Sequence, residues 1–295
     1  MVSSTVPLRR PIFIVAAPRS GSTLLFETLA AHRGLSNLGG EAHWLVESIA
    51  ELKIGAPAIT SNRLTAANLS STVASRMIAA IADRLADSAG QPAVLTPTTR
   101  LLEKTPKNSL RIPFFNRLFP DAQFIFLWRE PRGNVSSIIE AWRSGNWKTY
   151  NGLDGFEGPW SLILPPDWPS MNGRPVEEIA AFQWETTNRV VLDDLALLPQ
   201  RRWTSVSYAD FLDDPATTIE RLCAFIDVDV DENLRRRLAS PLPLSRYTQT
   251  PPLPGKWKNN AEQVERIMPQ VEPTWRRLEA LRAIKTPRSG IYAAR

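Results

Sequence analysis

Apolar residues follow two patterns along the chain, and their alternation predicts the fold class. Residues 11–17 and 123–128 are almost continuously apolar, as strands buried on both faces of a sheet are. Residues 65–88 instead place apolar side chains at four-residue steps, which is typical of a helix. Alternating strands and helices predict an α/β fold, with a parallel β-sheet flanked by helices on both faces. In chain order we expect a strand over 11–17, a helix ending near residue 32, helices over 42–52, 65–88 and 108–118, a strand over 123–128, a helix from residue 134, a helix over 176–197, a strand over 202–207 and a helix over 216–225.

Residues 144–175 depart from this alternation. They are rich in Gly, Pro and Trp, and Trp147, Trp160 and Trp168 follow no clear period. A segment of about 30 residues without regular structure is uncommon in a compact domain and is often a lid or a binding element. The alternative is that its tryptophans complete the core. No linker or repeat divides the rest of the chain, so we expect a single domain over 1–295.

Composition indicates a folded protein of the cytoplasm. Of 295 residues, 43% are hydrophobic and 22% are charged, which is ordinary for a globular chain. No apolar run approaches the roughly 20 residues of a membrane span, and we see no secretion signal, so we expect no stable membrane insertion. Cys223 is the single cysteine, which excludes an internal disulfide and argues against structural zinc.

The net charge of +5 is compatible with an anionic ligand. Lys and Arg are spread along the chain without a basic block, so extended nucleic-acid binding is not expected. A solvated surface is the simplest interpretation of this charge. The charge does not exclude a compact anion-binding site.

The loop after the first predicted strand is the first candidate anion site. Residues 16–23 read AAPRSGST, and the nucleotide-binding pattern GxxxxGK[ST] is matched at Gly21 and Thr23 only. Ser22 replaces the lysine that contacts phosphates in ATP-using enzymes, and Arg129 follows the next central strand where an acidic residue would hold magnesium. Both departures disfavour Mg-ATP chemistry.

A loop that opens a helix still presents free backbone N–H groups to an anion. The helix dipole contributes about 0.3–1 kcal/mol at exposed sites, and a charge-assisted hydrogen bond contributes about 1.5–3 kcal/mol. Arg19 and the loop amides therefore matter more than the dipole. The alternative is an ordinary strand-to-helix turn.

Arg129 and Ser137 form the second candidate anion site. Arg129 ends the strand over 123–128, and Ser137 lies in the first turns of the following helix. Parallel strands place both loops at the carboxyl edge of the sheet, where ligands bind in open α/β folds. A ligand with two separated anionic groups would fit, unless Arg129 pairs with a helix acid and Ser137 only caps the helix.

These residues resemble the sulfotransferases that use 3′-phosphoadenosine 5′-phosphosulfate (PAPS). PRSGSTLL at 18–25 is similar to the 5′-phosphosulfate loop of that family, and R-x7-S from Arg129 to Ser137 is similar to its 3′-phosphate site. The segment LLEKTPKNSLRIPFFNRLFPDAQFIFLWREPR resembles the connection between these motifs in the branch of tyrosylprotein and bacterial sulfotransferases. SYADFLDDPATTIERLCAFI at 207–226 and GKWKNN at 255–260 resemble later family segments.

The resemblance implies a P-loop-like fold and transfer of a sulfuryl group from PAPS to a hydroxyl or amine, without a metal ion. The product would be adenosine 3′,5′-bisphosphate (PAP). Residues 144–175 would be an acceptor-binding insertion and residues 250–260 a basic closing loop. The acceptor would be a small molecule or carrier-bound, and neither its identity nor the oligomeric state follows. The implied nucleotide-binding residues are Pro18, Arg19, Ser20, Gly21, Ser22, Thr23, Arg129 and Ser137, with Tyr208 and Trp257 at the adenine and Lys256 or Lys258 at the 3′-phosphate.

The resemblance also suggests catalytic residues. Arg19 would bind the phosphosulfate, and Lys104 in EKTP would face the transferring group, whereas Lys107 is expected to face solvent. Glu41 is the favoured base, His43 is the alternative and His32 is a third candidate. The rival functions are an ATP-dependent P-loop phosphotransferase and a nucleotide-binding module without catalysis.

Overall fold

A four-stranded parallel sheet forms the centre of the computed structural model, which describes residues 8–248 and 253–285. The strands are β1 (Ile12–Val15), β2 (Leu102–Glu103), β3 (Gln123–Trp128) and β6 (Trp203–Ser207), in the spatial order β2-β1-β3-β6. The parallel α/β prediction is confirmed. Val15 pairs with Phe126 in register, so β1 and β3 end side by side.

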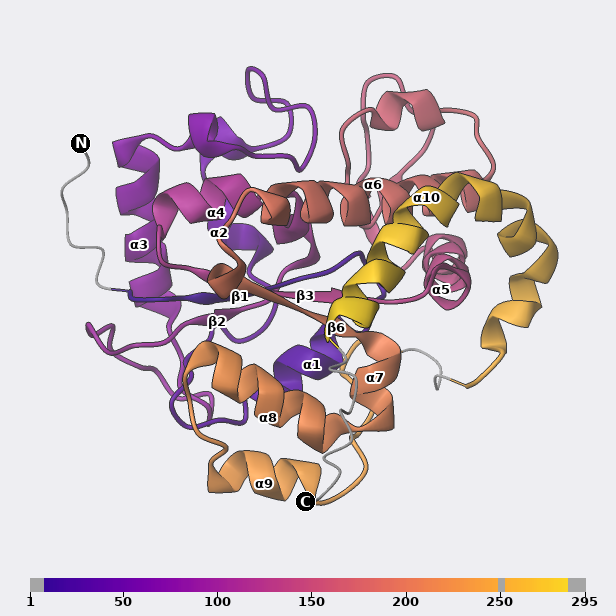
Figure 1. Ribbon diagram of the computed structural model, residues 1–295. Helices are drawn as coiled ribbons and strands as arrows, with labels where there is room; N and C mark the ends of the chain where they lie inside the picture. Colours follow the sequence, from indigo (N-terminus) through magenta and orange to yellow (C-terminus); the bar gives the residue numbers. More distant parts are fainter. Residues whose placement is uncertain (1–7, 249–252, 286–295) are drawn as a thin grey trace, which may run out of the picture.

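Alternate residues of the buried strands supply the cores on the two faces of the sheet. Phe13 and Phe124 belong to one hydrophobic cluster, and Ile14 and Ile125 belong to the other. The first face is covered by α3 (Ser71–Arg84), α4 (Ile112–Leu118), α5 (Pro131–Ser144), α6 (Val176–Ala196) and α10 (Ala261–Lys285), and the second by α1 (Ser22–Leu29), α7 (Tyr208–Asp213), α8 (Pro215–Ile226) and α9 (Glu232–Leu238). Figure 1 shows the sheet between these two layers.

Several predicted helices are divided or shifted, because capping residues lie inside the predicted ranges. The helix expected over 65–88 is split into η2 (Ala66–Asn68) and α3, since the Ser70 side chain accepts a hydrogen bond from the Val73 N–H at 3.1 Å. The range 42–52 contains α2 (His43–Glu47) and η1 (Ala50–Leu52), and η3 (Pro106–Leu110) precedes α4.

The helix predicted from residue 134 begins earlier, at Pro131. Proline is tolerated in a first helical turn, and the Glu130 side chain caps α5 by accepting from the Gly133 N–H at 2.7 Å. The helix predicted over 216–225 corresponds to α8, and Asp214 caps it after the separate helix α7. The sequence did not predict α9.

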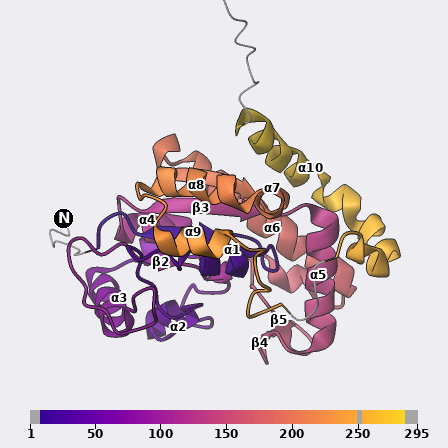
Figure 2. The same cartoon turned by 90° about the horizontal axis from the view of Figure 1, so that it is seen from below.

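Residues 144–175 contain a small hydrophobic core of their own. The hairpin of β4 (Lys148–Tyr150) and β5 (Trp160–Ser161) lies beside α5 in Figure 2, and η4 (Trp168–Met171) follows it. Trp160 and Trp168 are buried, with ring centroids 6.0 Å apart. These two tryptophans therefore complete a core, as the alternative interpretation proposed, whereas Trp147 lies elsewhere.

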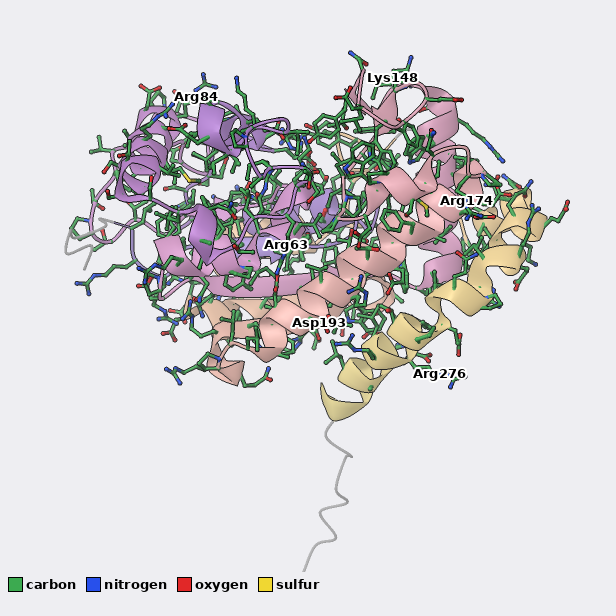
Figure 3. The ribbon with its side chains drawn as sticks, turned by 90° about the horizontal axis from the view of Figure 1, so that it is seen from above. Arg63, Arg84, Lys148, Arg174, Asp193 and Arg276 are labelled. Carbon is green, nitrogen blue, oxygen red and sulfur yellow. The ribbon has the colours of Figure 1, made fainter. Side chains whose placement is uncertain are left out.

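Helices α6 and α10 pack against each other over the sheet, and Figure 3 shows them from this side. Arg63 forms a two-pronged ion pair with Asp194 of α6, which ties the loop before α3 to this layer. η5 (Gln200–Arg202) and η6 (Lys256–Asn260) complete the described elements. None of the helices in residues 8–248 and 253–285 combines the length and apolarity needed to cross a membrane.

Candidate active site

A cavity of about 980 Å³ opens beyond the carboxyl ends of β1 and β3. Most of the residues that the sequence predicts for the site line this cavity. They are Pro18, Arg19, Gly21, Ser22, Thr23, Glu41, His43, Arg129, Ser137, Tyr208, Lys256 and Trp257. Ser20, Lys104 and Lys258 lie outside the lining.

The loop between β1 and α1 is shaped by left-handed backbone at Arg19 (φ 64°) and Gly21 (φ 92°). A side chain at Gly21 would place its Cβ 2.2 Å from the Tyr208 ring, so only glycine fits there. The Ser20 hydroxyl donates to Asn134 Oδ1 at 2.7 Å, and Asn134 Nδ2 donates to the Pro18 carbonyl at 2.8 Å. The Ser20 side chain therefore anchors the loop to α5 instead of facing the cavity.

Arg19 carries a half-buried charge without an ion-pair partner in the described part of the chain. Its Nη1 donates to the Tyr247 carbonyl at 3.4 Å, and its guanidinium lies 4.8 Å from the Trp147 ring centroid. Its Nε is buried and has no hydrogen-bond partner among the described residues. Burial lowers the pKa of Arg19, and the nearby charge of Arg129 lowers it further. An anion would satisfy the free donor and relieve this electrostatic cost.

Arg129 faces the same cavity from the end of β3. Its Nη1 donates to the Arg19 carbonyl at 3.3 Å, and its guanidinium lies 5.0 Å from the Tyr208 ring centroid. No carboxylate of the described residues forms an ion pair with it, so the expected alternative of pairing with a helix acid is wrong. Two arginines thus meet at adjacent strand ends.

Glu41 and Lys104 form an ion pair next to this loop. Lys104 Nζ donates to Glu41 Oε1 at 2.5 Å and to Thr23 Oγ1 at 2.8 Å, and His43 Nε2 donates to Glu41 Oε2 at 2.9 Å. Lys104 is almost fully buried and does not line the cavity itself. Its two hydrogen-bond partners, Thr23 and Glu41, do line it.

The environment keeps Glu41 ionised. Burial alone would raise the pKa of Glu41, but the hydrogen bond from His43 and the charge of Lys104 outweigh burial and lower it to about 2. Burial lowers the pKa of Lys104, and the charge of Glu41 opposes that shift. The pair is therefore a carboxylate held against an ammonium group.

The segment EKTP positions this pair through Thr105. Its Oγ1 accepts from the Ala42 N–H at 2.8 Å and donates to Glu103 Oε1 at 2.5 Å. Asn108 Nδ2 also donates to Glu103, at 2.7 Å. The buried Glu103 thus fixes Thr105, and Thr105 fixes the backbone beside Glu41.

The predictions for His32 and Lys107 need correction. His32 lies outside the cavity lining: its Nδ1 accepts from the Gly34 N–H and its Nε2 lies 2.9 Å from the Asp229 carbonyl. Lys107 was expected to face solvent, but it is only 3% exposed and its Nζ lies 2.5 Å from Glu47 Oε1. The spacing in EKTPK does not show that its second lysine also meets a carboxylate, so the sequence did not predict this pair.

The described part of the predicted closing loop packs against α5. Lys256 Nζ lies 2.7 Å from Glu140 Oε2, and Asn260 Nδ2 donates to Ser136 Oγ at 2.9 Å. Arg132 lies over Trp257 at 5.6 Å, whereas Lys258 is exposed. Residues 250–252 of this loop lie outside the described residues.

Asn134 and Tyr247 also belong to the site, and the sequence did not predict them. Asn134 is a buried polar residue on an otherwise apolar helix face, which is a detectable signal once that helix is placed. Tyr247 lies 5.7 Å from Lys104 Nζ by its ring centroid, and it comes from an irregular segment without a periodic pattern.

Comparison with known proteins identifies the family. A sequence model of the sulfotransferase family matches residues 11–232, which is well over half of the chain. The chain belongs to the sulfotransferase family. The resemblance inferred from the sequence is thereby confirmed, and membership implies transfer of a sulfuryl group. No curated protein sequence matches this sulfotransferase.

Solved sulfotransferase structures share the fold. The enzyme from Alicyclobacillus acidocaldarius is 16% identical, with a TM-score of 0.52 over 92% of this chain and 95% of that chain. Mouse sulfotransferase SULT7A1, solved with PAP, is 13% identical, with a TM-score of 0.53 over 94% of this chain and 88% of that chain. At these identities the likeness shows the fold alone, and it supports the P-loop-like class.

The ion pair at Glu41 predicts a pH-dependent stability of this sulfotransferase. Because the folded-state pKa of about 2 is below the ordinary 4.5, the contribution is complete above about pH 4.5 and is lost as the pH falls towards 2. The free energy of unfolding of wild type minus that of Glu41→Gln should be constant above about pH 5. It should shrink by up to about 3 kcal/mol between pH 5 and pH 2 in chemical denaturation.

The control for this measurement is Glu51→Gln. Glu51 pairs with Arg76 at 3.1 Å on the surface, with 58% of its side chain exposed. Its variant should follow the pH dependence of wild type. A difference between wild type and Glu41→Gln that stays constant down to pH 2 would contradict the ionised pair.

Proposed function

We propose that this sulfotransferase moves a sulfuryl group from PAPS to a hydroxyl or amine of a small-molecule or carrier-bound acceptor, without a metal ion. The observation that supports this most is the pair of arginines, Arg19 and Arg129, that face one cavity without carboxylate partners among the described residues. A nucleotide with phosphate groups at both its 3′ and 5′ positions supplies two separated anions. Such a ligand would satisfy both guanidinium groups.

The loop of residues 18–23 would bind the 5′-phosphosulfate. Arg19 has a buried Nε with no partner in the described contacts, so a donor is available there. The N-terminus of α1 adds backbone N–H groups, which bind anions in many proteins. Gly21 allows the close approach of Tyr208 that shapes this end of the cavity.

The 3′-phosphate would bind Arg129 and Ser137. Arginine can bind phosphate in a forked geometry that lysine cannot reproduce. Tyr208 and Trp257 both line the cavity and would contact the adenine, with Lys256 close to the nucleotide. Lys258 is exposed and outside the lining, so Lys256 is the preferred lysine.

Glu41 would accept the acceptor's proton. A carboxylate with a pKa of about 2 is a weak base. A bound polyanion near Lys104 would offset the charge that stabilises the ionised form of Glu41, and so would raise its pKa. His43 donates to Glu41 Oε2 and would orient it.

Lys104 would act on the charge that develops as the sulfuryl group moves. Its hydrogen bonds join Glu41 to Thr23 of the phosphosulfate loop, so it lies between the proposed base and the proposed donor. Cations placed in advance where charge develops are a large source of rate enhancement. In-line transfer then requires the acceptor hydroxyl to lie beside Glu41.

Nucleotide binding tests the first part of this proposal. Calorimetry with PAP and with ATP, each with and without magnesium, should show metal-independent binding of PAP only. Arg129→Ala should weaken PAP binding at least about tenfold, because a charge-assisted hydrogen bond is lost. Arg117→Ala, an exposed position on α4, is the control and should bind PAP as wild type does.

The rival functions give different results in the same experiment. A preference for Mg-ATP would indicate a P-loop phosphotransferase. Binding of PAP without consumption of PAPS by any acceptor would indicate a nucleotide-binding module.

Turnover tests the proposed base. Glu41→Gln should lower turnover by about 10² to 10⁴, the usual contribution of general-base catalysis, and should retain PAP binding. His43→Ala should have a smaller effect, because it removes only an orienting hydrogen bond. The turnover of each variant is measured as release of PAP from PAPS with a panel of phenols, alcohols and amines. Unchanged turnover in Glu41→Gln together with its loss in His43→Ala would assign the base to His43.

A further inference from the structure

A second glutamate–lysine pair borders the cavity, apart from the pair proposed for catalysis. Lys107 Nζ donates to Glu47 Oε1 at 2.5 Å, and both residues line the cavity. Glu47 ends α2, and Glu41 lies just before that helix begins. Nothing in the proposed sulfuryl transfer uses this second pair.

Lys107 holds Glu47 in a fixed position. It is 3% exposed, and its Nζ also lies 4.8 Å from the Tyr150 ring centroid. The Tyr150 hydroxyl in turn accepts from Asn62 Nδ2 at 2.7 Å. The buried ammonium group therefore has little freedom, and it fixes one oxygen of the Glu47 carboxylate.

The other oxygen of Glu47 is available to a ligand. Among the described residues, Oε2 forms no hydrogen bond, and 35% of the Glu47 side chain is exposed where it lines the cavity. An ionised carboxylate only accepts hydrogen bonds, so a group bound here must be a donor. Since Oε1 already accepts a hydrogen bond from Lys107, one further donor at Oε2 would give each carboxylate oxygen a hydrogen bond.

Helix α2 places Glu47 one turn beyond the histidine that contacts the proposed base. His43 and Glu47 are four residues apart and so lie on the same face of α2, about 6 Å apart along its axis. His43 donates directly to Glu41. Trp147, Leu162 and Ile163 give the same cavity apolar walls.

We propose that Glu47 is a specificity-determining residue that binds a second polar group of the acceptor. The acceptor would have an apolar or aromatic body, the reacting hydroxyl at one end, and a hydrogen-bond donor, either a hydroxyl or a protonated amine, at the other. This inference rests on the proposed function, because it places the reacting hydroxyl beside Glu41.

Three phenols with the same body provide the test. 4-Ethylphenol has no second polar group, tyrosol carries a second hydroxyl and tyramine carries an ammonium group. With PAP bound, wild-type protein should bind tyrosol or tyramine at least about tenfold more tightly than 4-ethylphenol in calorimetry, since a hydrogen bond to a charged group is gained. Glu47→Ala should abolish this preference and leave the affinity for 4-ethylphenol nearly unchanged.

Two variants control for structural effects. Glu51→Gln removes a surface carboxylate of the following element, η1, and should keep the preference. Glu47→Gln keeps an acceptor oxygen but no charge, so it should retain part of the preference for tyrosol and lose more of the preference for tyramine. A merely structural role of Glu47 would lower stability and leave selectivity among the three phenols unaltered.

The outcomes separate this inference from the function on which it rests. If PAP binds but the three phenols bind equally, or none binds, the assignment of Glu47 is overturned and the proposed function stands. If Glu47→Ala still prefers tyrosol or tyramine over 4-ethylphenol, the assignment of Glu47 is overturned as well. If PAP itself fails to bind, both proposals are overturned.

Discussion

The repulsion between Arg19 and Arg129 is the constraint on which the site depends. Parallel pairing of β1 with β3 brings both side chains to one cavity, and burial together with the nearby charge of Arg129 makes the charge of Arg19 costly. Cation–aromatic contacts with Trp147 and Tyr208 hold the guanidinium groups but do not neutralise them. A bound polyanion is the natural partner, and three glutamate–lysine pairs, Glu41 with Lys104, Glu47 with Lys107 and Glu140 with Lys256, lie around that space.

The sequence predicted the parts of the fold that depend on burial. The strand over 123–128 is apolar after its first residue because both of its faces are covered, and its observed bounds are the predicted ones. Helix bounds were less accurate where a single polar residue decides the end. Ser70 caps a helix inside a range whose periodicity predicts one continuous helix, and periodicity alone does not distinguish a capping serine from a solvent-facing one.

The candidate site was predictable where it follows the strand ends. Arg19, Arg129 and the loop of residues 18–23 are fixed by the sheet, so their meeting follows from parallel topology. Lys107 and Tyr247 were not predictable in this way. Lys107 is buried where α2 places Glu47 beside it, and Tyr247 reaches the cavity from an irregular segment, so both depend on contacts between distant parts of the chain.

A crystal structure of the protein with bound PAP would show whether the two arginines hold one nucleotide. The guanidinium of Arg129 should bind the 3′-phosphate, and Arg19, with the backbone N–H groups of residues 20–23, should bind the 5′-phosphate of the same molecule. PAP bound elsewhere, or bound in this cavity with either arginine out of reach of its phosphates, would contradict this arrangement.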